Sequence, residues 1–183
     1  MKNPFDLWAM QEIICEVRPD LIIECGSPYG ASAVMWSMIL HQLGSGRVLA
    51  IDIADEFDDA RALPAAHRID FLIGSSVDSA TIDEARRHAG AAERVTVVLD
   101  SDHSRAHVLA ELEAYAPLAT TGSYLVGEDG HVNGQPVQEF AFGADGGPFE
   151  AVTEFLELHP EFTADRSREG LITWSPKGFL QRA

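Results

Sequence analysis

Acidic side chains follow two strand-like segments of this chain, where they could bind a cation. Asp100 and Asp102 come at the end of the apolar run VTVVL, and Glu128 and Asp129 directly follow YLVG. The carboxyl ends of neighbouring parallel strands meet at one edge of an α/β sheet, where ligands bind. Carboxylates gathered there would repel one another unless a cation lay among them, and their oxygens suit Mg²⁺. We therefore predict a metal site; the alternative is that Asp102 caps a helix while Glu128 and Asp129 face solvent.

A histidine lies close to these acids in the sequence. His103 follows Asp100 by three positions, and histidine is the commonest general base near neutral pH. We expect His103 and Asp100 to form the catalytic pair, with His103 taking a proton from a hydroxyl held beside the metal. A surface or packing role for His103 is the alternative.

A glycine turn forms a second candidate site, in the segment LIIECGSPYGAS at 21–32. Gly26 and Gly30 follow a buried run and precede a helical one, so the backbone can approach a ligand and direct N–H groups at it. Ser27 and its neighbours replace the central glycine of the dinucleotide fingerprint, which disfavours a pyrophosphate. The turn therefore predicts a nucleotide-type cofactor without phosphates, most simply S-adenosylmethionine, unless the glycines serve only the turn.

Polar residues end the next two strand-like runs. Asp52 ends VLAID, where an acid in this kind of fold accepts hydrogen bonds from ribose hydroxyls. Gly74, Ser75 and Ser76 follow the third run and could border an adenine ring, although Ser76 could equally cap a helix. We expect the acids after Asp52, from Asp55 to Asp59, to form a solvated face.

Composition excludes several classes of partner. The chain has 183 residues, 46% of them hydrophobic, and its 29 acidic and 13 basic residues give a formal charge of −16. Such a charge repels nucleic acid and anionic membrane surfaces, and no segment is long and apolar enough to span a membrane. Two cysteines, Cys15 and Cys25, form no disulfide framework or zinc motif, which favours the cytoplasm.

Strand-like and helical patterns alternate along the chain and predict a Rossmann-like α/β fold. It would be a single domain over 1–183, with seven mostly parallel strands, an antiparallel last strand and helices on both faces. The predicted strands are Asp20–Glu24, Arg47–Ile53, Asp70–Ile73, Arg94–Asp100, Ser123–Gly127, Phe162–Asp165 and Gly170–Ser175. The predicted helices are Phe5–Val17, Ala31–Leu43, one from Ser76 or Asp78 to His88, one from Asp102 or Ser104 to Tyr115, and Glu150–Leu158. A long loop, Gly130–Pro148, would lie near the ligand-binding edge.

Several segments together resemble the cephalosporin hydroxylase family over nearly the whole chain. They are PDLIIECGSPYGAS, VLDSDHSRAHVLAELEAYAPLATTGSYLVGEDG, GPFEAVTEFL and WSPKGFLQR. That family is similar in fold to class I S-adenosylmethionine-dependent O-methyltransferases, including Mg²⁺-dependent macrocin and catechol types. The resemblance implies methyl transfer to a hydroxyl of a small molecule such as a sugar or natural product, with S-adenosylmethionine and Mg²⁺ as cofactors.

The resemblance also implies roles for particular residues. Glu24 would bind the methionine amino end of the cofactor, Gly26 and Ser27 would contact it from the turn, and Asp52 would bind the ribose. The metal would be held by an acid after the fourth strand and two after the fifth, which match Asp100 or Asp102 with Glu128 and Asp129. His103 stands where catechol-type enzymes have a lysine base.

Two departures from the family pattern bear on function. Ala31 replaces a common second glycine, and a long N-terminal extension that some members use to cover substrate is not found. A partner subunit in a homo-oligomer could supply such a cover. Two other functions stay open: a metal-dependent hydroxylase, as the family name suggests, and a cofactor-binding module without turnover.

Overall fold

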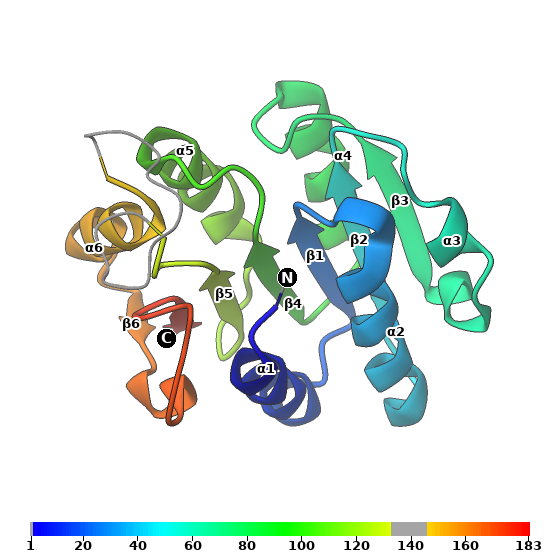
Figure 1. Ribbon diagram of the computed structural model, residues 1–183, viewed down its shortest axis with the longest axis horizontal. Coiled ribbons are helices and arrows are strands. Elements are labelled where there is room, and N and C mark those ends of the chain that lie inside the picture. Colours follow the sequence, from blue (N-terminus) through cyan, green and yellow to red (C-terminus); the bar gives the residue numbers. More distant parts are fainter. Residues whose placement is uncertain (1, 133–145) are drawn as a thin grey trace.

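Seven strands form one sheet in the computed structural model, which describes residues 2–132 and 146–183 (Figure 1). The strands are β1 (Leu21–Cys25), β2 (Arg47–Asp52), β3 (Ile69–Ile73), β4 (Val95–Leu99), β5 (Tyr124–Gly127), β6 (Phe162–Ala164) and β7 (Phe179–Arg182). Their order is β3-β2-β1-β4-β5-β7-β6, and β1 to β5 pair in parallel. β7 is antiparallel to both β5 and β6, which confirms the predicted fold with its antiparallel last strand.

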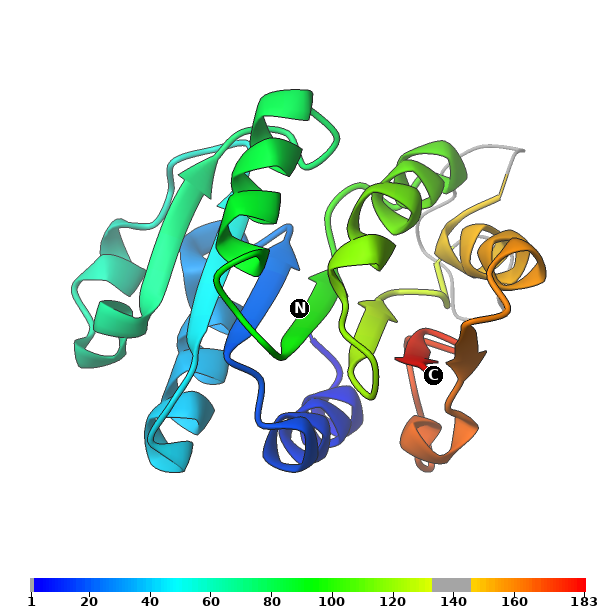
Figure 2. The same cartoon turned by 180° about the vertical axis from the view of Figure 1, so that it is seen from behind.

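Helices cover both faces of the sheet (Figure 2). The α-helices are α1 (Pro4–Val17), α2 (Ala31–Leu43), α3 (Asp58–Arg61), α4 (Ser79–Ala89), α5 (Arg105–Tyr115) and α6 (Pro148–Leu158). Short 3₁₀ turns are η1 (Pro28–Gly30), η2 (Pro64–Arg68), η3 (Ala116–Leu118) and η4 (Arg166–Glu169). Buried side chains of α1 and α2 share one core cluster with the sheet, and those of α4, α5 and α6 share the other.

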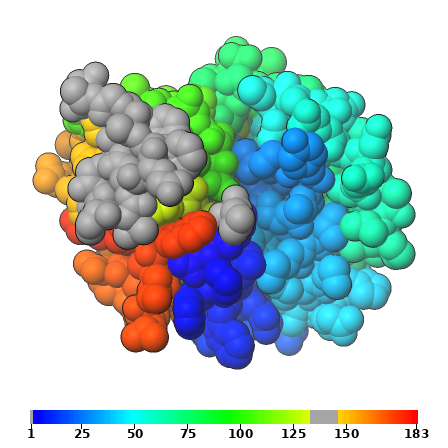
Figure 3. Space-filling model, in the orientation of Figure 1, coloured from blue at the N-terminus to red at the C-terminus, as the bar shows by residue number. Residues whose placement is uncertain are grey.

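The helix α1 closes one face of the molecule. Figure 3 shows it in dark blue between α2 and the C-terminal segment around η4, both of which it contacts. Asn3 caps α1 through a bond that its side chain accepts from the backbone N–H of Phe5, and Pro4 stands at the first turn, where a missing N–H costs nothing. Met10, Ile13 and Ile14 bury its inner side. The predicted helix Phe5–Val17 is thus confirmed.

The position of the last strand was predicted wrongly. No strand forms over Gly170–Ser175, where Leu171 and Ile172 are exposed; the last strand is β7, at Phe179–Arg182. β7 can approach β5 because residue 178 is glycine, and a Cβ there would lie 2.1 Å from the backbone oxygen of Gly127. Only two residues of this four-residue strand are buried, so its sequence pattern is weak.

Of the predicted loop Gly130–Pro148, residues 133–145 lie outside the described part. Its flanks, 130–132 and 146–147, belong to no helix or strand, and Pro148 already begins α6. Within 2–132 and 146–183, no helix combines the length and apolar character needed to cross a membrane.

Candidate active site

Three acids lie on one face of adjacent strands, at or just past their carboxyl ends. Side chains alternate between the two faces of a strand, so Glu24, Asp100 and Glu128 point to the face that α1 and α2 cover. Each stands two positions after a core residue of that face: Ile22, Val98 and Val126. Because β1, β4 and β5 are neighbours in the sheet, the three carboxylates come together.

The side chain of Lys2 lies among these acids. Its Nζ is 2.8 Å from Asp100 Oδ2, 2.8 Å from Glu128 Oε1 and 3.5 Å from Glu24 Oε1. The carboxylates raise the pKa of Lys2 although burial opposes this. This contact could not be predicted from the sequence, because Lys2 reaches the acids only after α1 has packed on the sheet.

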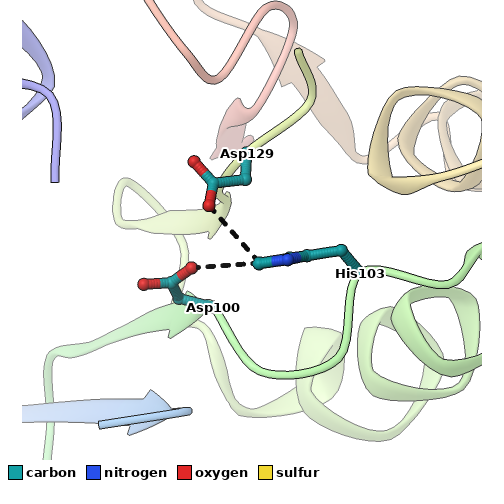
Figure 4. A group of neighbouring side chains, drawn as sticks. All are labelled: Asp100, His103 and Asp129. Carbon is teal, nitrogen blue, oxygen red and sulfur yellow. Dashed lines mark hydrogen bonds and ion pairs between the residues drawn. The ribbon is translucent and has the colours of Figure 1, made fainter. Parts of the chain in front are cut away.

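On the other side of Asp100, His103 and Asp129 complete a second group (Figure 4). His103 Nε2 lies 3.3 Å from Asp100 Oδ1 and 3.4 Å from Asp129 Oδ2. His131 Nδ1 is 3.7 Å from the other oxygen of Asp129 and 3.0 Å from the backbone oxygen of Trp174. The two oxygens of Asp100 therefore face two nitrogen groups, the ammonium of Lys2 and the imidazole of His103.

Burial and neighbouring charges shift the pKa values of these acids in different directions. Burial raises the pKa of Glu128 to about 8, with the charge of Asp100 adding to the effect and Lys2 opposing it. Burial and Asp100 likewise raise the pKa of Asp129. Burial also acts on Asp100, but the charge of Lys2 and the hydrogen bond from His103 lower its pKa overall. The pKa of His103 is raised against the effect of burial, through its contacts with Asp100 and Asp129.

These residues suit a hard divalent cation. Asp100, His103 and Asp129 each offer a ligand atom, and the three atoms lie within 4.8 Å of one another. Carboxylate oxygens are the ligands that Mg²⁺ prefers. Glu128 is linked to this group through Lys2, which contacts both Glu128 and Asp100. Asp102 stands apart from this group: it is exposed, and its Oδ1 accepts a 2.7 Å bond from the backbone N–H of Ser104, just before α5.

A cavity of about 390 Å³ opens beside the acids, within the size range of small-molecule sites. It shares Asp100 with the acidic group. The predicted cofactor residues that line it are Gly26, Asp52, Gly74, Ser75, Ser76 and Asp100, and Asp102 lies there too. Asp52 is half-buried at the end of β2, and Asp78, not Ser76, stands at the N-cap position of α4. The ends of four strands, β1 to β4, therefore contribute residues to one cavity.

Glu24, Ser27 and Gly30 lie behind the cavity wall. Glu24 is fully buried and accepts 2.9 Å bonds from the hydroxyl of Ser27 and the indole N–H of Trp36. Gly30 is buried, and a Cβ there would lie 2.8 Å from that of Ala60. These residues fix the shape of the turn, and their predicted direct contact with a cofactor stays a prediction.

A polar group at the wall of the cavity joins the predicted residue Ser76 to Ser101 and Glu111, which were not predicted as site residues. His107 Nε2 lies 3.2 Å from the hydroxyl of Ser76 and 3.5 Å from Glu111 Oε1, and Ser101 donates a 2.6 Å bond to the same oxygen. Glu111 is fully buried. Glu111 follows His107 by four positions on α5, which places both side chains on one face of that helix. This spacing is visible in the sequence and could have pointed to the pair.

Comparison with known proteins identifies the family. The family described as Rhamnosyl O-methyltransferase/CmcI matches residues 1–183. The chain belongs to this family. A rhamnosyl O-methyltransferase of Mycobacterium tuberculosis is 38% identical over 189 residues, which are 99% of this chain and 74% of the relative. The rhamnosyl O-methyltransferase of Mycobacterium leprae is 36% identical over 192 residues, 100% of this chain and 80% of the relative.

Solved structures place this chain among class I methyltransferase folds. A CmcI structure with Mg and SAM has a TM-score of 0.73 at 17% identity, covering 100% of this chain and 72% of that one. An O-methyltransferase of Bacillus cereus in complex with SAH has a TM-score of 0.60 at 18% identity, covering 88% and 72%. At these identities the likeness establishes the fold, as predicted from the sequence.

Proposed function

We propose that this chain transfers the methyl group of S-adenosylmethionine to a hydroxyl of a rhamnosyl or similar sugar group, in a Mg²⁺-dependent reaction. The single observation that carries this proposal is that the cavity and the acidic group share Asp100, so a cofactor and a cation would meet there. The mycobacterial relatives are named for rhamnosyl methylation, and the CmcI structure carries Mg and SAM. These names favour methyl transfer over the hydroxylase and non-catalytic alternatives.

The site has two parts: the cavity would bind the cofactor, and the acidic group would bind the metal. At the cavity, Asp52 would accept hydrogen bonds from the ribose hydroxyls, and the turn at Gly26 would hold the methionyl part. S-adenosylmethionine supplies an electrophilic methyl group when it is bound. Glu24 would act indirectly, by anchoring Ser27 and so the shape of the turn.

At the acidic end, Asp100, Glu128 and Asp129 would hold Mg²⁺, which lowers the pKa of a nearby hydroxyl. His103 would accept the proton of the sugar hydroxyl through Nε2. A cation bound to Asp100 and Asp129 would compete with His103 for these carboxylate oxygens and so make Nε2 available to accept a proton. Alignment of the acceptor oxygen with the methyl group would supply a further part of the rate acceleration.

Calorimetric titration with S-adenosylhomocysteine, with and without Mg²⁺, tests the proposal first. We expect binding in both conditions and tighter binding with the metal; no heat in either condition would refute it. Methyl transfer to a rhamnoside is the second test. His103→Gln should lower kcat by roughly 10²-fold or more while leaving the affinity for S-adenosylhomocysteine near that of the wild type.

Two further features belong to this proposal. Both cysteines are free, Cys15 exposed and Cys25 buried, which suits a protein working in a reducing cytoplasm. A partner subunit in a homo-oligomer would cover the acceptor at the open end of the cavity. Light scattering of the purified protein, with and without the cofactor product, measures the number of subunits.

A further inference from the structure

The ammonium of Lys2 stands between two carboxylates that the proposed function assigns to the metal. Its Nζ is equidistant from Asp100 Oδ2 and Glu128 Oε1, at 2.8 Å each, and the side chain of Glu128 is only 8% exposed. Glu24 faces the same ammonium from β1 at 3.5 Å. Within the described residues, this lysine is the cation that joins the ends of three strands.

A divalent ion bound by the same acids would need the same space. Mg²⁺ holds carboxylate oxygens at about 2.0 to 2.1 Å, so an ion that joins Glu128 to Asp100 must come close to where the ammonium now lies. Two cations at such a distance repel each other strongly in a buried site. We propose that Lys2 is a built-in competitor of the divalent ion, which pairs with Asp100 and Glu128 before the ion binds and leaves them when it does.

The start of α1 allows this exchange. The helix begins at Pro4, and its first turn is held by Asn3, through its side chain to the N–H of Phe5 and its carbonyl to the N–H of Leu7. Lys2 precedes these caps, so its side chain can leave the acids without breaking a bond of the helix. Breaking these ion pairs would cost free energy and so weaken metal binding. In the metal-free protein, the same ion pairs would offset the repulsion among the acids.

The alternative is coexistence. An ion could instead lie between Asp100 Oδ1 and Asp129 Oδ2, the side that His103 faces. Lys2 would then keep Asp100 Oδ2 and Glu128, and the ammonium would be a permanent part of the site. The two arrangements differ in one observable, the environment of the Lys2 side chain when the metal is bound.

Nuclear magnetic resonance of lysine side chains separates them, because the chain has only two lysines, Lys2 and Lys177. The protein is labelled with ¹³Cε-lysine, and Lys177→Met assigns the two signals. Mg²⁺ is then added in the presence of S-adenosylhomocysteine. We expect the Lys2 signal to move to the position of a solvated lysine, with the same midpoint as the heat of Mg²⁺ binding. Mg²⁺ binding that leaves the Lys2 signal in place would overturn the proposal.

Calorimetry of variants gives an independent test. Lys2→Met should bind Mg²⁺ about tenfold more tightly than the wild type, because no charged hydrogen bonds are lost on binding. Lys2→Arg keeps the competing charge and should stay near the wild type, as should Lys177→Met. Equal or weaker binding by Lys2→Met contradicts competition.

This inference rests on the proposed function, but the two fail differently. If no variant gives heat with Mg²⁺, both are refuted. If Mg²⁺ binds and Lys2 stays, only the competition fails. If Lys2→Met requires Mg²⁺ to fold, the labelled wild-type protein still decides the question.

Discussion

Gly26 and Asp100 lie so close together that no side chain fits between them. A Cβ at Gly26 would lie 2.0 Å from the backbone oxygen of Asp100, and the φ of Gly26 is +80°. The turn after β1 is therefore pressed against the end of β4, which joins the wall of the cavity to the acidic group. Glycine at this position follows from packing as well as from backbone conformation.

Gly26→Ala should therefore destabilise the protein and disrupt cofactor binding together. We expect a loss of about 3 kcal/mol or more in the free energy of unfolding, from left-handed strain and overlap combined. Urea unfolding measures the stability, and titration with S-adenosylhomocysteine measures the binding.

Gly44 provides the matched control. Its φ is +85°, but a Cβ there would meet nothing within 4 Å, so Gly44→Ala should cost only the backbone strain, about 1 kcal/mol. Equal losses in the two variants would show that the contact between Gly26 and Asp100 contributes nothing.

Asp100 and Asp102 are equivalent candidates in the sequence but not in the structure. Asp100 shares His103 with Asp129, whereas Asp102 is exposed and pairs with the N–H of Ser104. Asp100→Asn should weaken Mg²⁺ binding by about tenfold or more, because a charged ligand is lost. Calorimetry with Mg²⁺ measures the effect.

Asp102→Asn serves as the comparison for that experiment. Asparagine keeps the oxygen that accepts the bond from Ser104, so the entry to α5 is preserved. We expect Mg²⁺ binding within about twofold of the wild type. A larger loss in Asp102→Asn than in Asp100→Asn would reverse the assignment.

The fold and the edge of the site could be predicted because they depend on local patterns. The alternation of side chains along β1, β4 and β5 places Glu24, Asp100 and Glu128 on one face. The role of Lys2 could not be predicted, since it depends on how α1 packs over that face. β7 was also missed, because its pairing depends on the close approach at Gly178 and not on a strong pattern of its own.

Asp52 tests the cavity as a cofactor site. It lines the cavity and its Oδ1 accepts a 3.1 Å bond from the N–H of Ala54, which holds the carboxylate in place. Asp52→Asn keeps the shape of the side chain but loses an acceptor for the ribose hydroxyls. We expect the affinity for S-adenosylhomocysteine to fall about tenfold, measured by calorimetry.

Asp55→Asn is the control for Asp52→Asn. Asp55 is exposed, pairs with Arg61 at 2.7 Å and is not among the residues that line the cavity. An exposed ion pair contributes little to stability, so both the fold and the affinity should persist. If the affinity for S-adenosylhomocysteine falls equally in both variants, the loss in Asp52→Asn comes from the change in net charge and not from a lost hydrogen bond to the ribose.

His107 and Glu111 make stability depend on pH. The hydrogen bond with Glu111 raises the pKa of His107 above its ordinary value of 6.5, with burial opposing the shift. The bound proton therefore stabilises the fold fully below the unfolded-state pKa, and this stabilisation is lost as the pH rises through the folded-state pKa. Urea unfolding at about pH 6 and about pH 8 brackets this change.

The comparison that isolates this pair is His107→Gln against the wild type. The difference in the free energy of unfolding between the wild type and His107→Gln should shrink by roughly 1 kcal/mol from the lower to the higher pH. Glu111 is fully buried, and its Oε2 has no hydrogen-bond partner among the described residues, so loss of the contact with His107 leaves a buried polar group with fewer partners. Parallel slopes for the wild type and His107→Gln would mean that His107 does not carry this proton.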